Sequence, residues 1–293
     1  MAETLATLFK DQIKRALVMT KAPTVITDEN VFQEGDLAIE AIVDEMSDQL
    51  FLPGSGIDGL ENLEELLALA ESGKSCLLLL EHYSNYDLTI FSTLARRAGG
   101  RGLDIARAVI AIAGMKLSED SPGLSALSSA YTKIMIFPSR SITDLDPEKN
   151  KAEIARAKAI NHAAMKSLIR HKYKGRLILL FPSGTRYRPW DPNTKKGVRE
   201  MDTYVRSFDY MCLIALNGEV LHVQKTDMLN DAVSQDIVRV TASPVINCNE
   251  FREKAREKVS EEEDKKQAVA DEIMKELEKM HITGEEKRQK LLK

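Results

Sequence analysis

The sequence is poor in cysteine and has no long hydrophobic run. Its 293 residues include three cysteines, Cys76, Cys212 and Cys248, which are far apart and each lie in an apolar stretch. This spacing excludes a zinc ribbon and does not support a disulfide framework, so a reducing compartment is expected. No stretch approaches the roughly 20 apolar residues needed to span a bilayer. The amphipathic N-terminus also lacks the apolar core of a signal peptide. We expect a soluble protein, or one that lies at most on a membrane surface.

The chain also lacks an excess of positive charge. Its formal net charge is −4 and its isoelectric point is near 5.9, so no overall positive field attracts nucleic acid. The hydrophobic fraction of 43% and the charged fraction of 29% are typical of an ordinary globular protein. At this length the chain can bury a large core, as one domain or as a main domain with a smaller one.

The first 72 residues predict a small helical N-terminal domain. Apolar residues recur at helical spacing in residues 5–17 and again in residues 37–50. The glycine-rich segment LPGSGIDG (52–59) has the composition of turns, and a third helical stretch follows it. We therefore expect domains at 1–72 and 73–293.

From residue 75 onward, short apolar runs alternate with helix-length segments. This alternation predicts an α/β fold, with a mixed and mostly parallel sheet flanked by helices. The expected helices lie near 86–97, 121–130 and 148–172. The expected strands are 76–80, 105–112, 133–137, 176–181, 210–216, 220–224 and 236–242.

The charged C-terminal segment predicts a long helix from about residue 249. Val269, Ile273, Leu277 and Met280 are three or four positions apart and form a narrow apolar stripe. We expect this stripe to pack on the domain, with the charged face in solvent. A coiled-coil partner is the alternative.

A histidine and an aspartate follow the leucines of LLLLEHYSNYDLTIF (77–91). His82 comes where a buried strand should end, and Asp87 where a helix should begin, with Ser84 or Asn85 as its cap. Local hydrogen bonding in a loop is the simplest interpretation. However, ligands of open α/β sheets bind at the carboxyl ends of strands. There, a carboxylate that accepts from one imidazole nitrogen leaves the other nitrogen free as a base.

The chain contains a second histidine with an aspartate five residues later, His222 and Asp227. His222 falls within an expected strand, and no helical pattern follows Asp227, so we interpret this pair as a chance match. No serine or cysteine nucleophile has an evident relation to His82. The base is therefore expected to act directly on a substrate hydroxyl.

A second set of polar residues, FPSGTRYRP (181–189), follows the expected strand 176–181. Gly184 permits an unusual backbone angle or close approach to a ligand. Arg186 and Arg188 present two guanidinium groups, which suit phosphate because they are planar donors that stay charged. A turn with solvated arginines is the alternative. Another strand, in KIMIFPSR, ends near Arg140. Together, the three strand ends indicate a hydroxyl nucleophile on a phosphorylated small molecule.

These motifs resemble, in their order, those of the glycerolipid acyltransferase family. The resemblance covers roughly residues 75–220, and its four blocks are EHYSNYD with His82, Ser84 and Asp87; IMIFPSR with Ser139 and Arg140; FPSGTR with Ser183, Gly184, Thr185 and Arg186; and the strand YMCLIAL with Ala215.

Two departures point to one branch of that family. Ser183 replaces the glutamate typical of membrane-bound lysophosphatidate acyltransferases, and the fourth block lacks its usual proline. Both features, with Arg188 and Pro189, resemble the soluble glycerol-3-phosphate acyltransferase of chloroplasts. That resemblance implies a location in the cytoplasm or in a plastid-stroma-like compartment, with contact to a membrane surface left open.

The resemblance implies acyl transfer to the sn-1 hydroxyl of glycerol 3-phosphate from acyl-carrier protein or coenzyme A thioesters. His82 would be the base, oriented by Asp87, and Arg140, Arg186 and Arg188 would bind phosphate. The residues expected to support the site are Ser84, Ser139, Ser183, Gly184 and Thr185. No cofactor besides the thioester co-substrate and no metal are expected. The alternatives are an sn-2 acyltransferase acting on lysophosphatidate, and a non-catalytic lipid- or carrier-binding homologue.

A basic stretch lies between residues 96 and 107. Its members, Arg96, Arg97, Arg101 and Arg107, could contact an acidic carrier protein or anionic lipid. A solvated helix end is the other interpretation, and the one that charge runs usually support.

Overall fold

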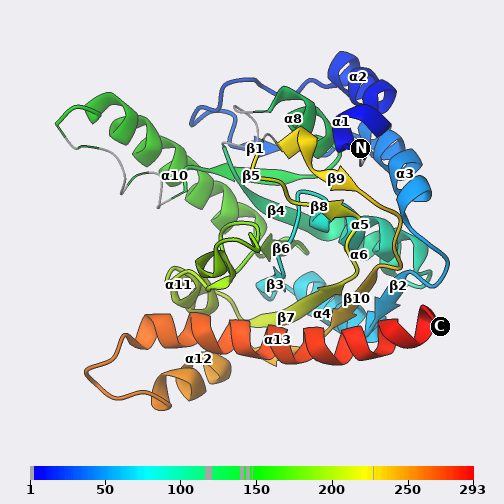
Figure 1. The fold of residues 1–293 in the computed structure, drawn as a ribbon. Coiled ribbons are helices and arrows are strands. Elements are labelled where there is room, and N and C mark those ends of the chain that lie inside the picture. The colour runs from blue at the N-terminus through cyan, green and yellow to red at the C-terminus, as the bar shows by residue number, and fades with distance from the viewer. Residues whose placement is uncertain (1–2, 116–120, 139–141, 143–145, 147, 227) are drawn as a thin grey trace.

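A computed structural model describes residues 3–115, 121–138, 142, 146, 148–226 and 228–293 (Figure 1). Ser139 and Arg140, two of the predicted site residues, lie outside the described residues, as does Asp227. The element labels used below are those of Figure 1.

Five parallel strands form the centre of the sheet. Their order across the sheet is β5 (Lys133–Ile136), β4 (Val109–Gly114), β6 (Leu177–Leu180), β3 (Cys76–Leu80) and β7 (Tyr210–Asn217). Every residue of β3 is buried, as expected of a central parallel strand that is covered on both faces.

The edges make the sheet mixed. Among the described residues it has nine strands. One edge is β1 (Phe32–Gln33), antiparallel to β5, while at the other β10 (Arg239–Ala242) is antiparallel to β7 and parallel to β2 (Gly56–Asp58). The short strand β11 (Ile246–Asn247) also pairs with β7. A separate hairpin joins β8 (Leu221–His222) to β9 (Ala232–Val233).

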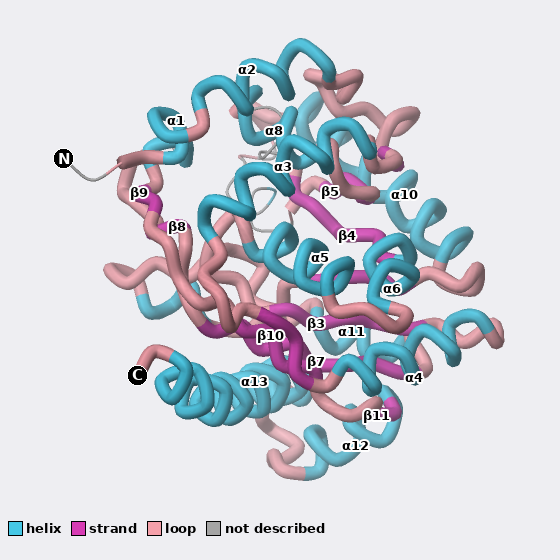
Figure 2. The backbone as a smooth tube through the Cα atoms, turned by 90° about the vertical axis from the view of Figure 1, so that its right-hand side faces the viewer, coloured by secondary structure: helices cyan, strands magenta, loops and turns pink. Residues whose placement is uncertain are grey.

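Helices cover both faces of the sheet (Figure 2). Side chains alternate along β3, so Leu78 and Leu80 join one hydrophobic cluster and Leu77 and Leu79 the other. Among the described residues, the first cluster contains residues of seven helices: α1 (Leu5–Leu8), α2 (Lys10–Met19), α3 (Leu37–Leu50), α4 (Leu60–Glu71), α5 (Asp87–Arg97), α6 (Gly102–Ala108) and α8 (Pro122–Ser128). In the same part of the chain, the second contains residues of four: α10 (Lys151–His171), α11 (Met201–Ser207), α12 (Cys248–Glu257) and α13 (Lys265–Leu291).

The α/β class predicted from the sequence is confirmed, with three corrections to the elements. Residues 105–108 end helix α6, and the strand begins only at Val109. The segment 220–224 contributes just Leu221 and His222 to a hairpin, not to the main sheet. The C-terminal segment is two helices, because α12 ends at Glu257 and Asp264 caps the start of α13.

The first 72 residues share the core of the main sheet. They supply its strands β1 and β2, and Phe9, Ile39 and Leu63 belong to the same hydrophobic cluster as Leu78 of β3. The turn-like segment 52–59 therefore includes an edge strand of the sheet.

The long helix α13 lies along β7 and β10 at the lower edge of Figure 1. The predicted stripe is confirmed for Val269, Ile273 and Leu277, which are fully buried, and Met280 is partly buried against the same cluster. Close packing is also required at Gly284, because a Cβ atom there would lie 2.1 Å from Oδ1 of Asn217.

Two isoleucines of α13 give a matched test of this packing. Ile273 has no exposed surface and Ile282 is 53% exposed. We expect Ile273→Ala to lower the free energy of unfolding by about 2–5 kcal/mol, because it leaves a cavity in the core. Ile282→Ala should change it by less than about 0.5 kcal/mol. Urea denaturation of both variants measures the difference, and equal midpoints would show that α13 is not stably packed.

Candidate functional site

The strand order places two of the predicted motifs at one edge of the sheet. Strands β3 and β6 are parallel neighbours, with Leu79 of β3 paired with Leu180 of β6. His82 and Phe181 follow these strands at their carboxyl ends, where open α/β sheets bind ligands. β7, which contains Ala215, is the neighbour of β3 on its other side.

Asp87 is the first residue of α5 and its carboxylate is buried, with 1% of the residue exposed. Its Oδ2 lies 2.9 Å from Nδ1 of His82. The backbone N–H groups of Tyr83 and Ser84 donate to it at 2.6 and 2.9 Å, and the Ser84 hydroxyl donates to Oδ1 at 2.7 Å. Because the carboxylate accepts from Nδ1, the hydrogen belongs on Nδ1 and Nε2 is left as the basic nitrogen.

The expected cap of α5 takes a different form. Tyr86 is the residue before the helix, and its N–H donates to the Ser84 hydroxyl at 3.0 Å. Ser84 therefore serves both the turn and Asp87, while Asn85 makes no capping bond to α5.

The His82 ring is fixed by neighbours from the third motif. It stacks on Phe181, with ring centroids 3.9 Å apart. The N–H of Tyr187 donates to the His82 carbonyl at 2.8 Å. The His82 side chain is 16% exposed, and no described group hydrogen-bonds with its Nε2.

The residues between Phe181 and Arg186 form a tight turn. The N–H of Gly184 donates to the Phe181 carbonyl, and Gly184 has a φ of +63°, which glycine adopts readily. The buried Ser183 hydroxyl donates to the Thr185 carbonyl at 2.7 Å. Ser183, Gly184 and Thr185 thus shape the backbone that approaches His82.

The two arginines of this motif have different surroundings. Nη1 of Arg186 donates to Oδ2 of Asp231 at 2.7 Å, and this pair is largely buried, with side chains 12% and 0% exposed. No described residue forms an ion pair or hydrogen bond with the Arg188 guanidinium, although its backbone N–H donates to the Thr194 hydroxyl. Arg188 is therefore the better placed of the two to bind an external anion.

A narrow cleft beside His82 contains residues that the sequence motifs did not include. It encloses about 10 Å³, roughly the room for one water molecule. Its lining comprises Glu81, His82, Tyr83, Pro182, Ser183, Tyr187, Thr194, Lys195 and Met274. A carboxylate directly after four leucines was the only sequence signal for Glu81, and nothing in the spacing connected Lys195 or Met274 to His82.

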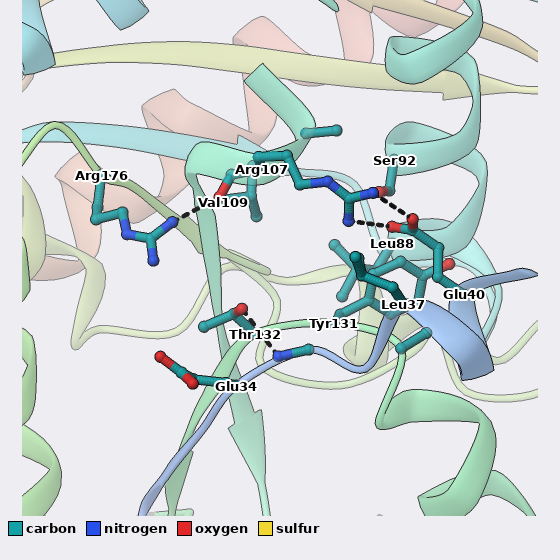
Figure 3. A pocket seen from close by; sticks show the side chains of 13 residues that line it. Glu34, Leu37, Glu40, Leu88, Ser92, Arg107, Val109, Tyr131, Thr132 and Arg176 are labelled. Atoms are coloured by element: carbon teal, nitrogen blue, oxygen red, sulfur yellow. Dashed lines mark hydrogen bonds and ion pairs between the residues drawn. The ribbon is translucent and has the colours of Figure 1, made fainter. Parts of the chain in front are cut away.

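A larger cavity of about 350 Å³ lies near the amino ends of β4 and β5 (Figure 3). Its lining includes Val109 and Thr132 but none of the described residues predicted for the site. Two of its charged side chains already bond within the protein: Arg107 pairs with both oxygens of Glu40, and Arg176 donates to the Arg107 carbonyl. We do not assign the chemistry of His82 to this cavity.

The basic stretch is neutralised by neighbouring helices. Arg96 bonds to Glu40 and Asp44, Arg97 to Asp48, Arg101 to Glu71, and Arg107 to Glu40. These arginines therefore tie α5 and α6 to α3 and α4.

His222 lies in the β8–β9 hairpin and does not line the cleft beside His82. Its Nε2 lies 2.7 Å from the Ser234 hydroxyl, and its side chain is 41% exposed. It thus offers a matched control for substitutions of His82.

Within the described residues, no helix combines the length and apolarity needed to cross a membrane. In that same part of the chain, no three histidine, cysteine, aspartate or glutamate side chains gather as a metal site would require. Comparison of the sequence with models of protein families gave no match, and comparison with curated proteins gave none either.

The buried pair of Arg186 and Asp231 predicts a loss of stability on substitution. We expect Arg186→Ala to lower the free energy of unfolding by about 3–5 kcal/mol, because it removes the guanidinium from a buried carboxylate. The exposed pair of Arg15 and Glu45, with side chains 51% and 46% exposed, provides the control. Arg15→Ala should cost no more than about 1 kcal/mol in the same urea titration. Equal losses in the two variants would contradict a structural role for Arg186.

Proposed function

We propose that the protein is a glycerol-3-phosphate acyltransferase. It would transfer a fatty acyl group from a thioester of acyl-carrier protein or coenzyme A to the sn-1 hydroxyl of glycerol 3-phosphate, giving lysophosphatidic acid. The observation that carries this proposal is the pair of His82 and Asp87, with Nδ1 bonded to a buried carboxylate and Nε2 without a described partner. The resemblance of the motifs to glycerolipid acyltransferases supplies the reaction.

In the proposed mechanism, Nε2 of His82 accepts the proton of the C1 hydroxyl. The oxygen attacks the thioester carbonyl carbon and forms a tetrahedral intermediate. The carbon–sulfur bond then breaks, and the leaving thiolate takes the proton from His82. Asp87 stabilises the imidazolium that exists between these two transfers.

The phosphate of the acceptor is proposed to bind to Arg188, with Arg186 contributing the N–H groups that Asp231 does not use. The Tyr187 N–H bonds to the His82 carbonyl, so the backbone that carries both arginines is adjacent to the base. Binding the phosphate there would orient the hydroxyl toward His82, which lowers the entropic part of the barrier. Arg140 keeps its predicted part in phosphate binding.

The first test concerns the base. We expect His82→Ala to lower kcat/KM by roughly 100- to 10,000-fold, measured as release of free thiol from an acyl thioester with glycerol 3-phosphate present. His222→Ala should keep wild-type turnover. Full activity of His82→Ala would remove the base from the mechanism.

Running the same assay with lysophosphatidate as acceptor separates the alternatives. Thiol release with that acceptor alone would indicate an sn-2 acyltransferase, and thiol release with neither acceptor would indicate a non-catalytic homologue. The proposal requires release with glycerol 3-phosphate.

The second test concerns the phosphate. We expect Arg188→Ala to raise the KM for glycerol 3-phosphate roughly tenfold or more, since a hydrogen bond to a charged group is lost. Stability should change little, in contrast to Arg186→Ala. The exposed Arg15→Ala variant is again the control, and a KM of Arg188→Ala equal to that of the control would place the phosphate elsewhere.

A further inference from the structure

The residue before His82 is tied to the C-terminal helix. Glu81 is 5% exposed, and its N–H donates to the Ile214 carbonyl of β7. Its Oε2 accepts from the Leu216 N–H at 2.8 Å and lies 3.0 Å from Nδ1 of His281 on α13. The carboxylate of Glu81 thus joins the end of β3 to both β7 and α13.

The residue after His82 contacts the same histidine. The Tyr83 hydroxyl donates to Oε1 of Glu81 at 3.1 Å, and its oxygen lies 3.3 Å from Nδ1 of His281. The Tyr83 ring packs between Tyr187 and His281, at centroid distances of 6.2 and 5.4 Å. Burial raises the pKa of Tyr83, so its hydroxyl keeps the proton that it donates.

His281 is itself held firmly in place. The Asn217 amide donates to its carbonyl at 2.9 Å, and Gly284, one turn further along α13, allows the close approach to β7. His281 therefore has a rigid position from which to act on the loop of Glu81, His82 and Tyr83.

On these contacts, and resting on the proposed function, we propose that His281 is a positioning residue for His82. It acts through Glu81 and Tyr83, the chain neighbours of His82, and fixes the loop so that Nδ1 stays on Asp87 and Nε2 stays toward the acceptor hydroxyl. None of the sequence motifs contains His281, which lies 200 residues from Glu81.

The contact between His281 and Glu81 depends on pH, because His281 can carry a charge. Burial alone would lower the pKa of His281, but the hydrogen bond and the charge of Glu81 outweigh burial and raise the pKa above its usual 6.5. Of the other charged groups that face it, Glu278 raises the pKa and Lys195 lowers it, and these two are paired at 2.5 Å. The contact between charged His281 and Glu81 is fully formed below about pH 6.5. It weakens as pH rises through the raised pKa of His281 in the folded state.

The test compares His281→Ala with His281→Asn, whose amide lies where Nδ1 was and can donate to Glu81 without titrating. We expect His281→Ala to lower kcat roughly tenfold, as displaced catalytic groups do, with the KM for glycerol 3-phosphate nearly unchanged. His281→Asn should recover most of kcat. Wild type should lose part of kcat as pH rises through the raised pKa of His281, and neither variant should show that pH-dependent loss.

A double-mutant cycle tests whether His281 acts on His82 through Glu81. Glu81→Gln should lower kcat like His281→Ala, and the double variant should lose no more than the larger single loss. Additive losses of kcat in the double variant would show that His281 does not act through Glu81. Wild-type kcat and pH profile in His281→Ala, or a kcat of His281→Asn no better than that of His281→Ala, would overturn the positioning role. His222→Ala is the control, and circular dichroism corrects each rate for the folded fraction.

One measurement separates failure of this proposal from failure of the proposed function. The Nδ1–H proton that His82 donates to Asp87 can be followed by NMR whether or not the protein transfers acyl groups. We expect it to exchange faster with water in His281→Ala than in wild type. An unchanged exchange rate overturns the positioning role, whereas absence of acyl transfer by wild type would overturn only the proposed function.

Discussion

The geometry of the candidate site depends on the buried carboxylate of Asp87. Four donors meet on it: Nδ1 of His82, the N–H groups of Tyr83 and Ser84, and the Ser84 hydroxyl. Its place at the first residue of α5 adds the favourable field of a helix N-terminus. A buried carboxylate without such donors is costly. The loop between β3 and α5 is therefore held in the one arrangement that satisfies Asp87, and that arrangement orients the His82 ring.

The parallel sheet brings the other parts of the site to this loop. Because β3 and β6 are neighbours, Phe181 can stack on His82 and Tyr187 can bond to its carbonyl. The same segment presents two arginines of different kinds. Arg186 is part of a buried ion pair with Asp231, whereas no described residue bonds to the Arg188 guanidinium. Of these two residues, only Arg186 is thus tied to the rest of the fold by its guanidinium.

The C-terminal helix closes the other side of the loop. α13 packs its apolar stripe on the sheet and places His281 against Glu81 and Tyr83, on either side of His82. The C-terminal helix α13 therefore contributes to the surroundings of His82. The backbone of α13 at Gly284 lies close to the Asn217 side chain of β7. This close packing makes the contact of His281 with Glu81 and Tyr83 rigid.

The sequence by itself determined the α/β class, the run of central strands, the apolar stripe of α13, and the position of His82 and Asp87 at a strand end. These features are local: periodicity, apolar runs and short spacings follow from the geometry of helices and strands. The prediction from the sequence was wrong for residues 105–108, which belong to a helix and not to a strand. Short apolar runs occur equally well in either element. Only the tertiary structure decided which charges are paired, that Arg186 bonds to Asp231, and that Glu81 meets His281. Those contacts join segments up to 200 residues apart. Their partners are brought together by the packing of α13 on the sheet and by the position of the β8–β9 hairpin beside α1, which no local pattern encodes.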